Sequence, residues 1–449
     1  MAGSVLIGID LGTTVLKVCA FDASTGSLLA QAARRLPVLA CAEGGREQRT
    51  GALDRAFRET VSEVQSLLGN RWKQTEGIGL AAQGGSTIIA ARATGKPLTP
   101  MILWNDGRSL RYAQRLAENA PAGLWRKTVL RDYPPSGLGR FLWMKETRPE
   151  LFRDEHIHIG AGEYLYFQLT GAWRQDAGNA IQIGSYHAGK KRLDATLLER
   201  VGVPLSFVAP LRRGHETSLL CKRGAKRLGL PEGVPVAGPY IDQEAGYLST
   251  PGGLEKPLQC SLGTAWVGNF TLPDDTTGFS PIQLPLPSPV GEGRLVVQPL
   301  LTGNPSWDWG LEQFTGLDRA AALGEAEGIF KKKLWPPAGL ICLPWFTQID
   351  PFNGRTYGGG VFTGMNDRTG GDDLLRAVAA GMACELARMF RAVREAGDIG
   401  AVALGGGASK GFYFRRMIAG LFAPLPVFWQ VDQDLAAARG SVYAFHPAA

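Results

Sequence analysis

The chain has few of the residues that build a metal cluster or a disulfide framework. Its 449 residues include six cysteines and five histidines, and no two cysteines are spaced as a CxxC pair. A disulfide-stabilised secreted domain and a Cys–His zinc site are therefore both disfavoured. We expect the cysteines to be reduced thiols of a cytoplasmic protein.

Long apolar runs and long basic runs are lacking as well. No apolar run approaches membrane-spanning length, and no charged-then-apolar leader precedes Val5. The basic clusters, KKR at 190–192 and KKK at 331–333, are short and do not alternate with aromatic residues. Neither a membrane nor a nucleic acid is therefore an expected partner. The net charge of +7 suits phosphate-bearing ligands.

What the chain does contain is two series of apolar, β-branched strands punctuated by glycine. It is too long for one compact core, so two domains are the default expectation. The first series begins with strands at 5–9 and 16–21 and a helix at 53–68; the second has strands at 234–237, 258–262, 267–272 and 427–431 and a helix at 374–396. These patterns predict two domains of related build, at residues 1–237 and 238–449.

The first strand pair, VLIGIDLGTTVLKVCAFD, carries a carboxylate where an ordinary hairpin has no need of one. Asp10 ends the first strand, and a turn with Gly12, Thr13 and Thr14 follows. Such a turn offers amide and hydroxyl donors to a polyphosphate, and a carboxylate oxygen is a ligand that Mg²⁺ prefers. A tight hairpin whose aspartate only caps the turn remains an equal alternative.

A second carboxylate follows the first strand of the second series. In GPYIDQEAG, Asp242 comes after a Gly-Pro break and is expected at a strand end that faces a cleft, with Gln243 beside it. An aspartate placed there can accept a hydroxyl proton during transfer to phosphate, and the amide can bind a hydroxyl. The alternative is a loop acid that caps the next helix.

Two further glycine loops follow predicted strands. SLGTAW (261–266) repeats the Gly-Thr theme of the first loop, and LGGGASK (404–410) precedes a predicted helix. Three glycines allow a flat ligand to lie against the backbone. For a GGG loop by itself, a flexible turn is the commoner explanation.

Taken in order, these stretches resemble the FGGY family of carbohydrate kinases. GIDLGTTVLKV is similar to its first phosphate loop, SLGTAW to its second, LGGGASKGFYFRRM to its adenosine loop, and GPYIDQEAG to the segment of its catalytic base; ILWNDGRS and RFLWMKETRPELF also fit. The resemblance implies an α/β fold with two actin-like ATPase (ribonuclease H-like) domains and an interdomain cleft. Within the family, ILWNDGRS and GGGASKGFYFRRM look most like xylulose kinases.

One stretch departs from the xylulose kinase pattern. Where those enzymes carry Gln-Met-His-Gly at the sugar, this chain has Gln83-Gly84-Gly85-Ser86. The Arg-Glu pair of glycerol kinases is also missing. Small residues here resemble some polyol and L-ketose kinases of the family.

The resemblance assigns a role to residues in both halves. Asp242 is the implied catalytic base, and Asp10 and Asp242 are the implied ligands of Mg²⁺. The sugar is implied to bind Asp242 and five further residues on the matching motifs: Gln83, Asn105, Asp106, Arg108 and Gln243. ATP is implied to bind Gly12, Thr13, Thr14, Lys17, Gly263, Thr264, Gly406, Gly407 and Ser409. For Lys17 a surface lysine is an equal alternative, and for Trp104 a core position is preferred to sugar stacking.

The implied activity is transfer of the γ-phosphate of MgATP to a hydroxyl of a pentulose such as xylulose. The alternatives are a kinase of another ketose or of a polyol (erythritol, a pentitol, an L-ketose) and a non-catalytic sugar-binding regulator on the same scaffold. An actin- or Hsp70-like ATPase would lack the IDQ and WNDGR stretches. The expected partners are thus small molecules, with a homodimer as the allowed assembly.

Overall fold

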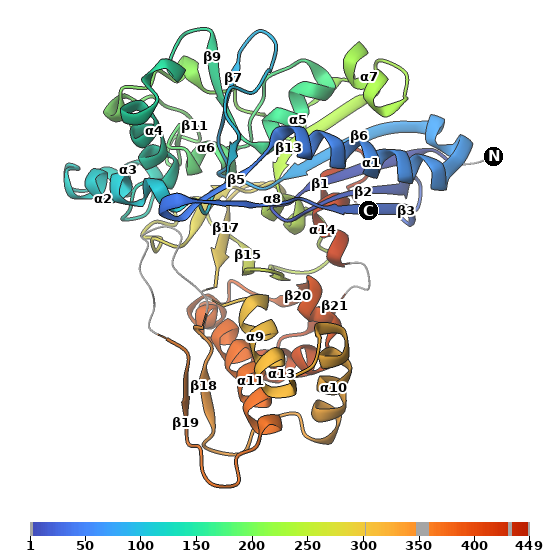
Figure 1. Ribbon diagram of the computed structural model, residues 1–449, viewed down its shortest axis with the longest axis vertical. Helices are drawn as coiled ribbons and strands as arrows, with labels where there is room; N and C mark the ends of the chain where they lie inside the picture. The colour runs from blue at the N-terminus through green and yellow to red at the C-terminus, as the bar shows by residue number, and fades with distance from the viewer. Residues whose placement is uncertain (1–2, 301, 347–358, 430–432, 448–449) are drawn as a thin grey trace. The chain divides into compact units, whose positions relative to one another are not determined.

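The computed structural model describes residues 3–300, 302–346, 359–429 and 433–447. It divides into two compact units (Figure 1). Unit 1 comprises residues 1–252, 273–295 and 435–449, and unit 2 comprises 253–272 and 296–434. The boundary expected after residue 237 lies inside strand β13 (Pro235–Ile241), so unit 1 extends further along the chain than that boundary.

Unit 1 is built on a six-stranded sheet of order β12-β13-β6-β1-β2-β3. Its strands are β1 (Val5–Leu11), β2 (Val15–Asp22), β3 (Leu28–Arg35), β6 (Thr75–Ala82), β12 (Thr217–Leu219) and β13. The expected hairpin is confirmed, because β1 pairs antiparallel with β2. β1, β6 and β13 run parallel, so their carboxyl ends share one edge of the sheet.

Helices cover both faces of this sheet. On one face α1 (Thr50–Leu68) buries Phe57, Val61 and Val64, apolar residues at helical spacing. On the other face α14 (Ala436–Ser441) packs directly against the strands. A Cβ on Gly8 of β1 would lie 2.2 Å from the Ala438 carbonyl oxygen, so glycine is needed for this close approach.

The remaining elements of unit 1 surround the sheet and carry several of the expected site residues. They are β4 (Leu39–Cys41), β5 (Gly45–Gln48), β7 (Ile88–Ala91), β8 (Met101–Ile102), α2 (Leu110–Glu118), α3 (Leu124–Val129), α4 (Ser136–Thr147), β9 (His156–Ile159), α5 (Ala161–Thr170), α6 (Ala177–Gln182), β10 (Tyr186–His187), β11 (Arg192–Leu193), α7 (Lys222–Leu228), α8 (Asp242–Leu248) and β16 (Leu284–Pro287). The proline-rich run 281–289 therefore contains a strand.

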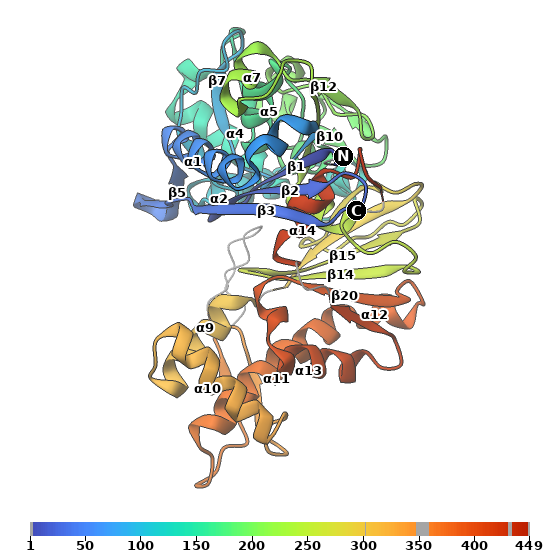
Figure 2. The same ribbon diagram turned by 90° about the vertical axis from the view of Figure 1, so that its right-hand side faces the viewer.

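Unit 2 repeats the strand order of unit 1. Its strands β17 (Arg294–Pro299, mostly in unit 2), β15 (Trp266–Leu272), β14 (Pro257–Leu262), β20 (Ala401–Gly405) and β21 (Val427–Trp429) follow the order β17-β15-β14-β20-β21. Figure 2 shows three of its strands, β14, β15 and β20. As in β1–β2, the β14–β15 pair is an antiparallel hairpin, and β20 and β21 continue in parallel. The sequence-based expectation of two related α/β domains is confirmed at the level of topology.

The helices of unit 2 are α9 (Asn304–Thr315), α10 (Arg319–Lys332), α11 (Gly371–Met389), α12 (Arg391–Glu395) and α13 (Phe412–Phe422), with a small hairpin of β18 (Ile341–Leu343) and β19 (Val361–Thr363). The helix expected over 374–396 is interrupted at Phe390, between α11 and α12. The expected strand 427–431 ends at Trp429, and its last two positions lie outside the described residues. Within the described ranges, no helix is long and apolar enough to cross a membrane.

Candidate active site

Two aspartates lie at the carboxyl-end edge of the parallel strands of unit 1. Asp10 pairs with Ala81 of β6, which in turn pairs with Tyr240 of β13, and Asp242 follows two residues later as the first residue of α8 (Figure 1). With neighbouring strands spaced about 4.8 Å apart, this register puts the two strand ends about 10 Å apart. Two residues 232 positions apart in sequence are thus brought to one edge.

Asp242 has a carboxyl group that is harder to ionise than that of an ordinary aspartate. Its side chain is half-buried, and its Oδ1 accepts a hydrogen bond from the Gln243 backbone N–H at 2.9 Å. Burial and the nearby charge of Asp10 raise the pKa of Asp242 to about 7, against the weaker effect of that hydrogen bond. A carboxylate with this pKa can take up a proton near neutral pH.

Asp10 is the more buried of the two, with 7% of its surface exposed. Burial raises its pKa, although Lys17 opposes the effect. The Lys17 Nζ lies 3.6 Å from the Asp10 Oδ2, because the two residues are paired across the β1–β2 hairpin. The structure therefore gives Lys17 a carboxylate partner.

The turn between β1 and β2 joins the site to two other segments. The Thr13 hydroxyl donates to the Gln83 Oε1 at 3.0 Å and accepts from the Trp104 indole N–H at 3.1 Å. Trp104 is half-buried, and its indole N–H bonds to Thr13. The expectation that Trp104 is a buried core residue is therefore wrong. Gly12 donates to the Val15 carbonyl at 3.1 Å, and Thr14 is exposed. Thr14 carries the exposed hydroxyl of this turn, whereas the hydroxyl of Thr13 is engaged by Gln83 and Trp104.

Gln83 is 3% exposed, and its carboxamide organises the turn. Besides Thr13, it accepts from the Ser86 hydroxyl at 3.1 Å. Gln48, which lies in the stretch GREQRTG but was not among the expected site residues, donates to the Thr13 carbonyl at 2.7 Å. The loop 83–86 and the turn 12–14 are thus connected by side chains.

In the WNDGR stretch, the side chains of Asp106 and Arg108 bond to other residues of the protein, whereas the side-chain oxygen of Asn105 does not bond to any described residue. The side chain of Asp106 is fully buried and accepts from the backbone N–H of Arg46 at 2.7 Å and from the Arg108 guanidinium at 2.7 Å. Arg108 also pairs with Glu47 at 2.7 Å. Asn105 differs, since its buried Oδ1 has no hydrogen-bond partner among the described residues. Such an acceptor is open to a hydrogen bond from a ligand or from water.

Arg140 of α4 bonds to the loop after β6 and to the segment before Asn105, and it was not among the expected site residues. It is 1% exposed and donates to the Gly85 carbonyl at 2.5 Å, the Thr87 hydroxyl at 2.9 Å and the Leu103 carbonyl at 3.2 Å. Burial lowers its pKa to about 10, which leaves it charged at neutral pH. A single arginine in an otherwise apolar helix stretch, GRFLWM, is the sequence signal for such a role.

A second arginine fixes the helix that begins with Asp242. Arg212 donates to the Asp176 Oδ2 at 2.7 Å and to both oxygens of Glu244 at 3.0 Å, and all three side chains are nearly buried. Burial opposes the charged form of Arg212, but the two carboxylates outweigh it and raise its pKa. Glu244 lies in the first turn of α8, so this ion group holds α8 in place.

In unit 2 the two glycine loops lie at the ends of neighbouring parallel strands. Gly263 and Thr264 connect β14 to β15, and Thr264 is exposed. Gly406 follows β20 with φ of 82°, and a Cβ there would lie 2.7 Å from the backbone of Leu262. Glycine is therefore required where the second loop passes the first.

Ser409 closes the loop after β20. Its hydroxyl donates to the Gly406 carbonyl at 2.6 Å and accepts from the Trp429 indole N–H at 3.2 Å, and its side chain is buried. Gly407 is exposed. The backbone of the loop is therefore accessible at Gly407, while the Ser409 hydroxyl holds the loop in its conformation through its two hydrogen bonds.

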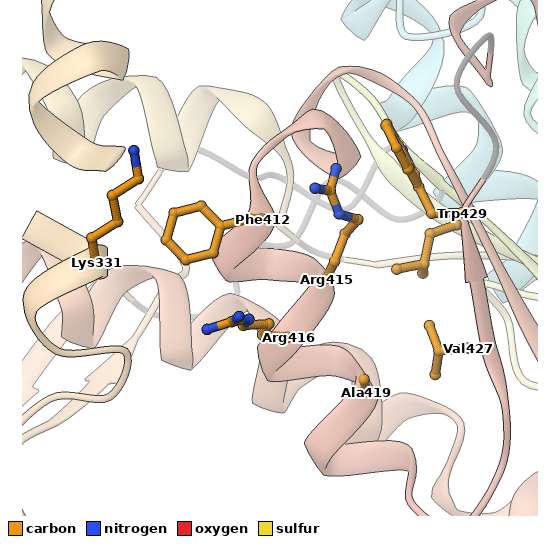
Figure 3. Close-up of a pocket in the computed structure, with 8 residues that line it drawn as sticks. Lys331, Phe412, Arg415, Arg416, Ala419, Val427 and Trp429 are labelled. Atoms are coloured by element: carbon orange, nitrogen blue, oxygen red, sulfur yellow. The ribbon is translucent and has the colours of Figure 1, made fainter. Parts of the chain in front are cut away.

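A cavity of about 600 Å³ lies beside this loop within unit 2 (Figure 3). Its cationic side chains are Lys331 of α10 and Arg415 and Arg416 of α13, and none of the described residues that line it is acidic. The Arg415 guanidinium lies 4.0 Å from the ring centroid of Trp429 and donates to the Ser409 carbonyl at 2.9 Å. Cations combined with aromatic rings suit an aromatic ligand that bears phosphate.

The sequence matches a known family over more than half of its length. A profile of the N-terminal domain of the FGGY family of carbohydrate kinases matches residues 5–249. The chain belongs to the FGGY family, and it is a carbohydrate kinase, a phosphotransferase. The recognition made from the sequence motifs is thereby confirmed.

Curated relatives are similar at modest identity. The xylulose kinase of Escherichia coli is 26% identical over 92% of this chain and 84% of its own length. The xylulose kinase of Bacillus subtilis is 26% identical over 58% of this chain, a match that spans about half of the relative's length. A glycerol kinase of Haloarcula marismortui is 24% identical over 99% of this chain and 89% of its own length.

Solved structures share the fold. A xylulose kinase from Rhodospirillum rubrum superposes with a TM-score of 0.84 at 19% identity, covering 98% of this chain and 89% of that one. A glycerol kinase from Plasmodium falciparum with ADP superposes with a TM-score of 0.83 at 16% identity, covering 98% and 88%. The actin-like α/β fold class expected from the motifs is confirmed.

Proposed function

We propose that the chain transfers the γ-phosphate of MgATP to a hydroxyl of a pentulose such as xylulose, with Asp242 as the catalytic base. The observation that carries the proposal is the pair of Asp242 and Asp10 at one sheet edge, with the pKa of Asp242 raised to about 7. Phosphoryl transfer needs a carboxylate that orients a hydroxyl and accepts its proton.

Asp242 acts on the sugar hydroxyl in this mechanism. Its free oxygen accepts a hydrogen bond from the hydroxyl and aims the oxygen at the phosphoryl group. Because the transition state of phosphoryl transfer is loose, orientation contributes more than early proton removal. Asp242 takes the proton late, and its raised pKa makes it a competent acceptor near pH 7.

A magnesium ion fits the donor chemistry of this edge. No group of three or more His, Cys, Asp or Glu side chains suited to a metal occurs in the described part of the chain. Mg²⁺ commonly keeps several waters and binds only one or two carboxylates together with substrate phosphates. Asp10 and Asp242 are such carboxylates, and their mutual repulsion is what a cation would relieve. When bound, the ion neutralises charge on the phosphates.

We assign the nucleotide to the glycine loops. In unit 1, the Thr13 backbone N–H and the exposed Thr14 hydroxyl suit phosphate oxygens. Gly12, whose own N–H is bonded to the Val15 carbonyl, allows a ligand to approach the backbone closely. In unit 2, Gly263 and Thr264 suit phosphate, and Gly406 and Gly407 suit the adenosine. The cationic cavity beside Ser409 supports this assignment (Figure 3). Lys17 acts through Asp10 in this proposal.

We assign the sugar to the loops around Gln83 and Asn105. Asn105 and Gln243 are the proposed direct ligands, since the Asn105 Oδ1 lacks a partner among the described residues. Gln83, Asp106 and Arg108 contribute by holding the loops, as their bonds to Thr13, to each other and to Glu47 indicate. The relatives named xylulose kinase support a pentulose.

A second candidate is a kinase of another ketose or of a polyol, such as erythritol, a pentitol or an L-ketose. The specific observation in its favour is the loop Gln83–Ser86, where two glycines stand in place of larger side chains. A probable L-xylulose kinase of Haemophilus influenzae is 24% identical over 58% of this chain. A non-catalytic regulator is disfavoured because both carboxylates are present.

The experiment is a coupled ADP-release screen over pentuloses, hexuloses, pentitols, tetritols and glycerol. We expect ADP release that depends on one of these, with xylulose among the best. Asp242→Asn removes both a base and an orienting group, so it should reduce turnover by about 1,000-fold or more. Calorimetry should show that nucleotide binding is nearly unchanged. Comparable turnover in Asp242→Asn would remove Asp242 from this role.

We further propose a cytoplasmic enzyme. All six cysteines are free thiols, Cys19, Cys260 and Cys342 being buried, which fits a reducing compartment. A homodimer remains part of the proposal, and its test is the solution mass.

A further inference from the structure

We propose that Gln182, at the end of α6, is a specificity-determining residue of the sugar site. Its carboxamide fills the space beside the two glycines of loop 83–86, and its Oε1 accepts a hydrogen bond from a hydroxyl of an uncharged sugar or polyol. This inference rests on the proposed kinase function and deepens it, because no motif of the chain assigns Gln182 a role.

The carboxamide of Gln182 and the glycines of the loop are matched in shape. A Cβ on Gly84 would lie 2.5 Å from the Gln182 Nε2, and a Cβ on Gly85 would lie 2.5 Å from its Oε1. Gly85 also has φ of +73°. Neither position can therefore carry a side chain while Gln182 occupies this space.

The same space borders the proposed catalytic residues. The Cβ position of Gly84 lies 3.2 Å from the Cγ2 of Ile241, the residue directly before Asp242. That of Gly85 lies 3.4 Å from the Cβ of Trp104, whose indole N–H bonds to Thr13. Gln182 thus lies between the segment that carries the base and the segment expected to hold the sugar.

The Nε2 of the Gln182 carboxamide has a hydrogen-bond partner, whereas its Oε1 has none among the described residues. The Nε2 donates to the Gly178 carbonyl of its own helix at 3.1 Å, which fixes the orientation of the amide. Nothing in the described ranges donates a hydrogen bond to its Oε1, and the side chain is half-buried. A carbonyl oxygen in that position accepts from a hydroxyl and cannot donate to a carboxylate.

The helix that carries Gln182 is fixed to the loop it faces. The Asn179 Oδ1 accepts from the Gly85 backbone N–H at 3.0 Å, and its Nδ2 donates to the Glu163 Oε1 at 2.9 Å. Asp176 caps the helix by accepting from Gly178 N–H at 2.5 Å. The place of Gln182 relative to the loop is therefore defined by buried bonds.

The charge around this point selects against anionic substrates. Asp10 and Asp242 lie at the same sheet edge as the proposed site, and Lys17 pairs with Asp10. A sugar acid would add a third negative charge beside an acceptor oxygen. A neutral ketose or polyol would not.

The test uses the full chain and the variant Gln182→Met, which keeps the length of the side chain and removes the acceptor. With the sugar that the wild type phosphorylates best, we expect KM to rise about 10-fold, the effect of one lost hydrogen bond, and KM for ATP to change less than about 2-fold. Gln65→Met is the matched control, because Gln65 of α1 is also a half-buried glutamine beside a glycine, Gly229. It should leave both KM values unchanged.

Deoxy analogues of the same sugar identify the contact. For the wild type, kcat/KM should be about 10-fold lower with one deoxy analogue than with the parent sugar. For Gln182→Met, kcat/KM should be the same with that analogue and with the parent sugar, as in a double-mutant cycle. Gln182→Ala, which also lacks the acceptor, should behave like Gln182→Met and serves if the methionine variant does not fold. Gluconate should not be phosphorylated by the wild type.

The outcomes separate the two proposals. No sugar-dependent ADP release by the wild type overturns the proposed function and the inference with it. Release by the wild type with an unchanged sugar KM in both Gln182 variants overturns the inference alone. Phosphorylation of gluconate at a rate similar to that of the best neutral substrate overturns the assignment to uncharged substrates.

Discussion

The raised pKa of Asp242 predicts that this carboxylate, the proposed catalytic base, destabilises the ligand-free protein at alkaline pH. Its pKa is raised from 3.8 to about 7 by burial and by Asp10. Between these values the folded protein binds a proton that the unfolded chain has released. The free energy of unfolding therefore falls as the pH rises from about 4 to about 7, and it stays low above that.

The magnitude follows from the size of the shift. A difference of about three pKa units corresponds to about 4 kcal/mol. Because the Asp242 side chain is partly exposed, solvent reduces this to about 2–4 kcal/mol. Asparagine has no proton to lose, so Asp242→Asn should exceed the wild type in stability by that amount at pH 8. The difference should vanish at pH 4.

The assay is urea denaturation at pH 4, 6 and 8 without nucleotide or metal. The chain has two compact units, so the transition of unit 1 is followed by hydrogen exchange in peptides from β1 and β13. Glu292→Gln, a substitution at an exposed loop carboxylate, is the control and should show no such gain. Equal stability of the wild type and Asp242→Asn at pH 8 would refute the assignment of a raised pKa.

Two more predictions concern the residues around this carboxylate. Asp10→Ala should weaken the magnesium-dependent part of ATP binding by about 10-fold or more, because Asp10 is a carboxylate proposed to hold the ion; calorimetry with and without Mg²⁺ measures it, and equal metal dependence in both proteins would contradict it. Arg212→Met should destabilise unit 1 by about 3–5 kcal/mol, because Asp176 and Glu244 are left as unpaired buried carboxylates. Urea denaturation measures that loss, and a change below about 1 kcal/mol would show that the ion group is not needed for stability.

Local patterns in the sequence were sufficient for the strands that carry the site. β1 and β2 were predicted because apolar runs flank a Gly-Thr turn, and the meeting of Asp10 and Asp242 follows once β1, β6 and β13 are parallel. The Gly-Pro step before Asp242 was expected to end its strand. Instead β13 continues to Ile241, with an irregular pairing between Ala237 and Tyr240.

Side-chain contacts between distant segments could not be predicted in this way. Arg212 bonds to residues 36 and 32 positions away, and no local pattern marks those partners. Trp104 was preferred as a core residue because tryptophan is mostly buried, yet its indole N–H bonds to the turn after β1. Strand β16 was missed because proline is rare in strands, and 281–289 contains four prolines.

The two carboxylates also constrain each other chemically. The charge of Asp10 is one of the two causes that raise the pKa of Asp242, so any group that neutralises Asp10 lowers that pKa. Lys17 does so only in part, at 3.6 Å. A divalent cation that arrives with the nucleotide and binds Asp10 would add two positive charges at the same point and favour the ionised form of Asp242. With its pKa at about 7, Asp242 is ionised in roughly half of the molecules at neutral pH, and the bound cation would increase this ionised fraction, which is the form that accepts a proton.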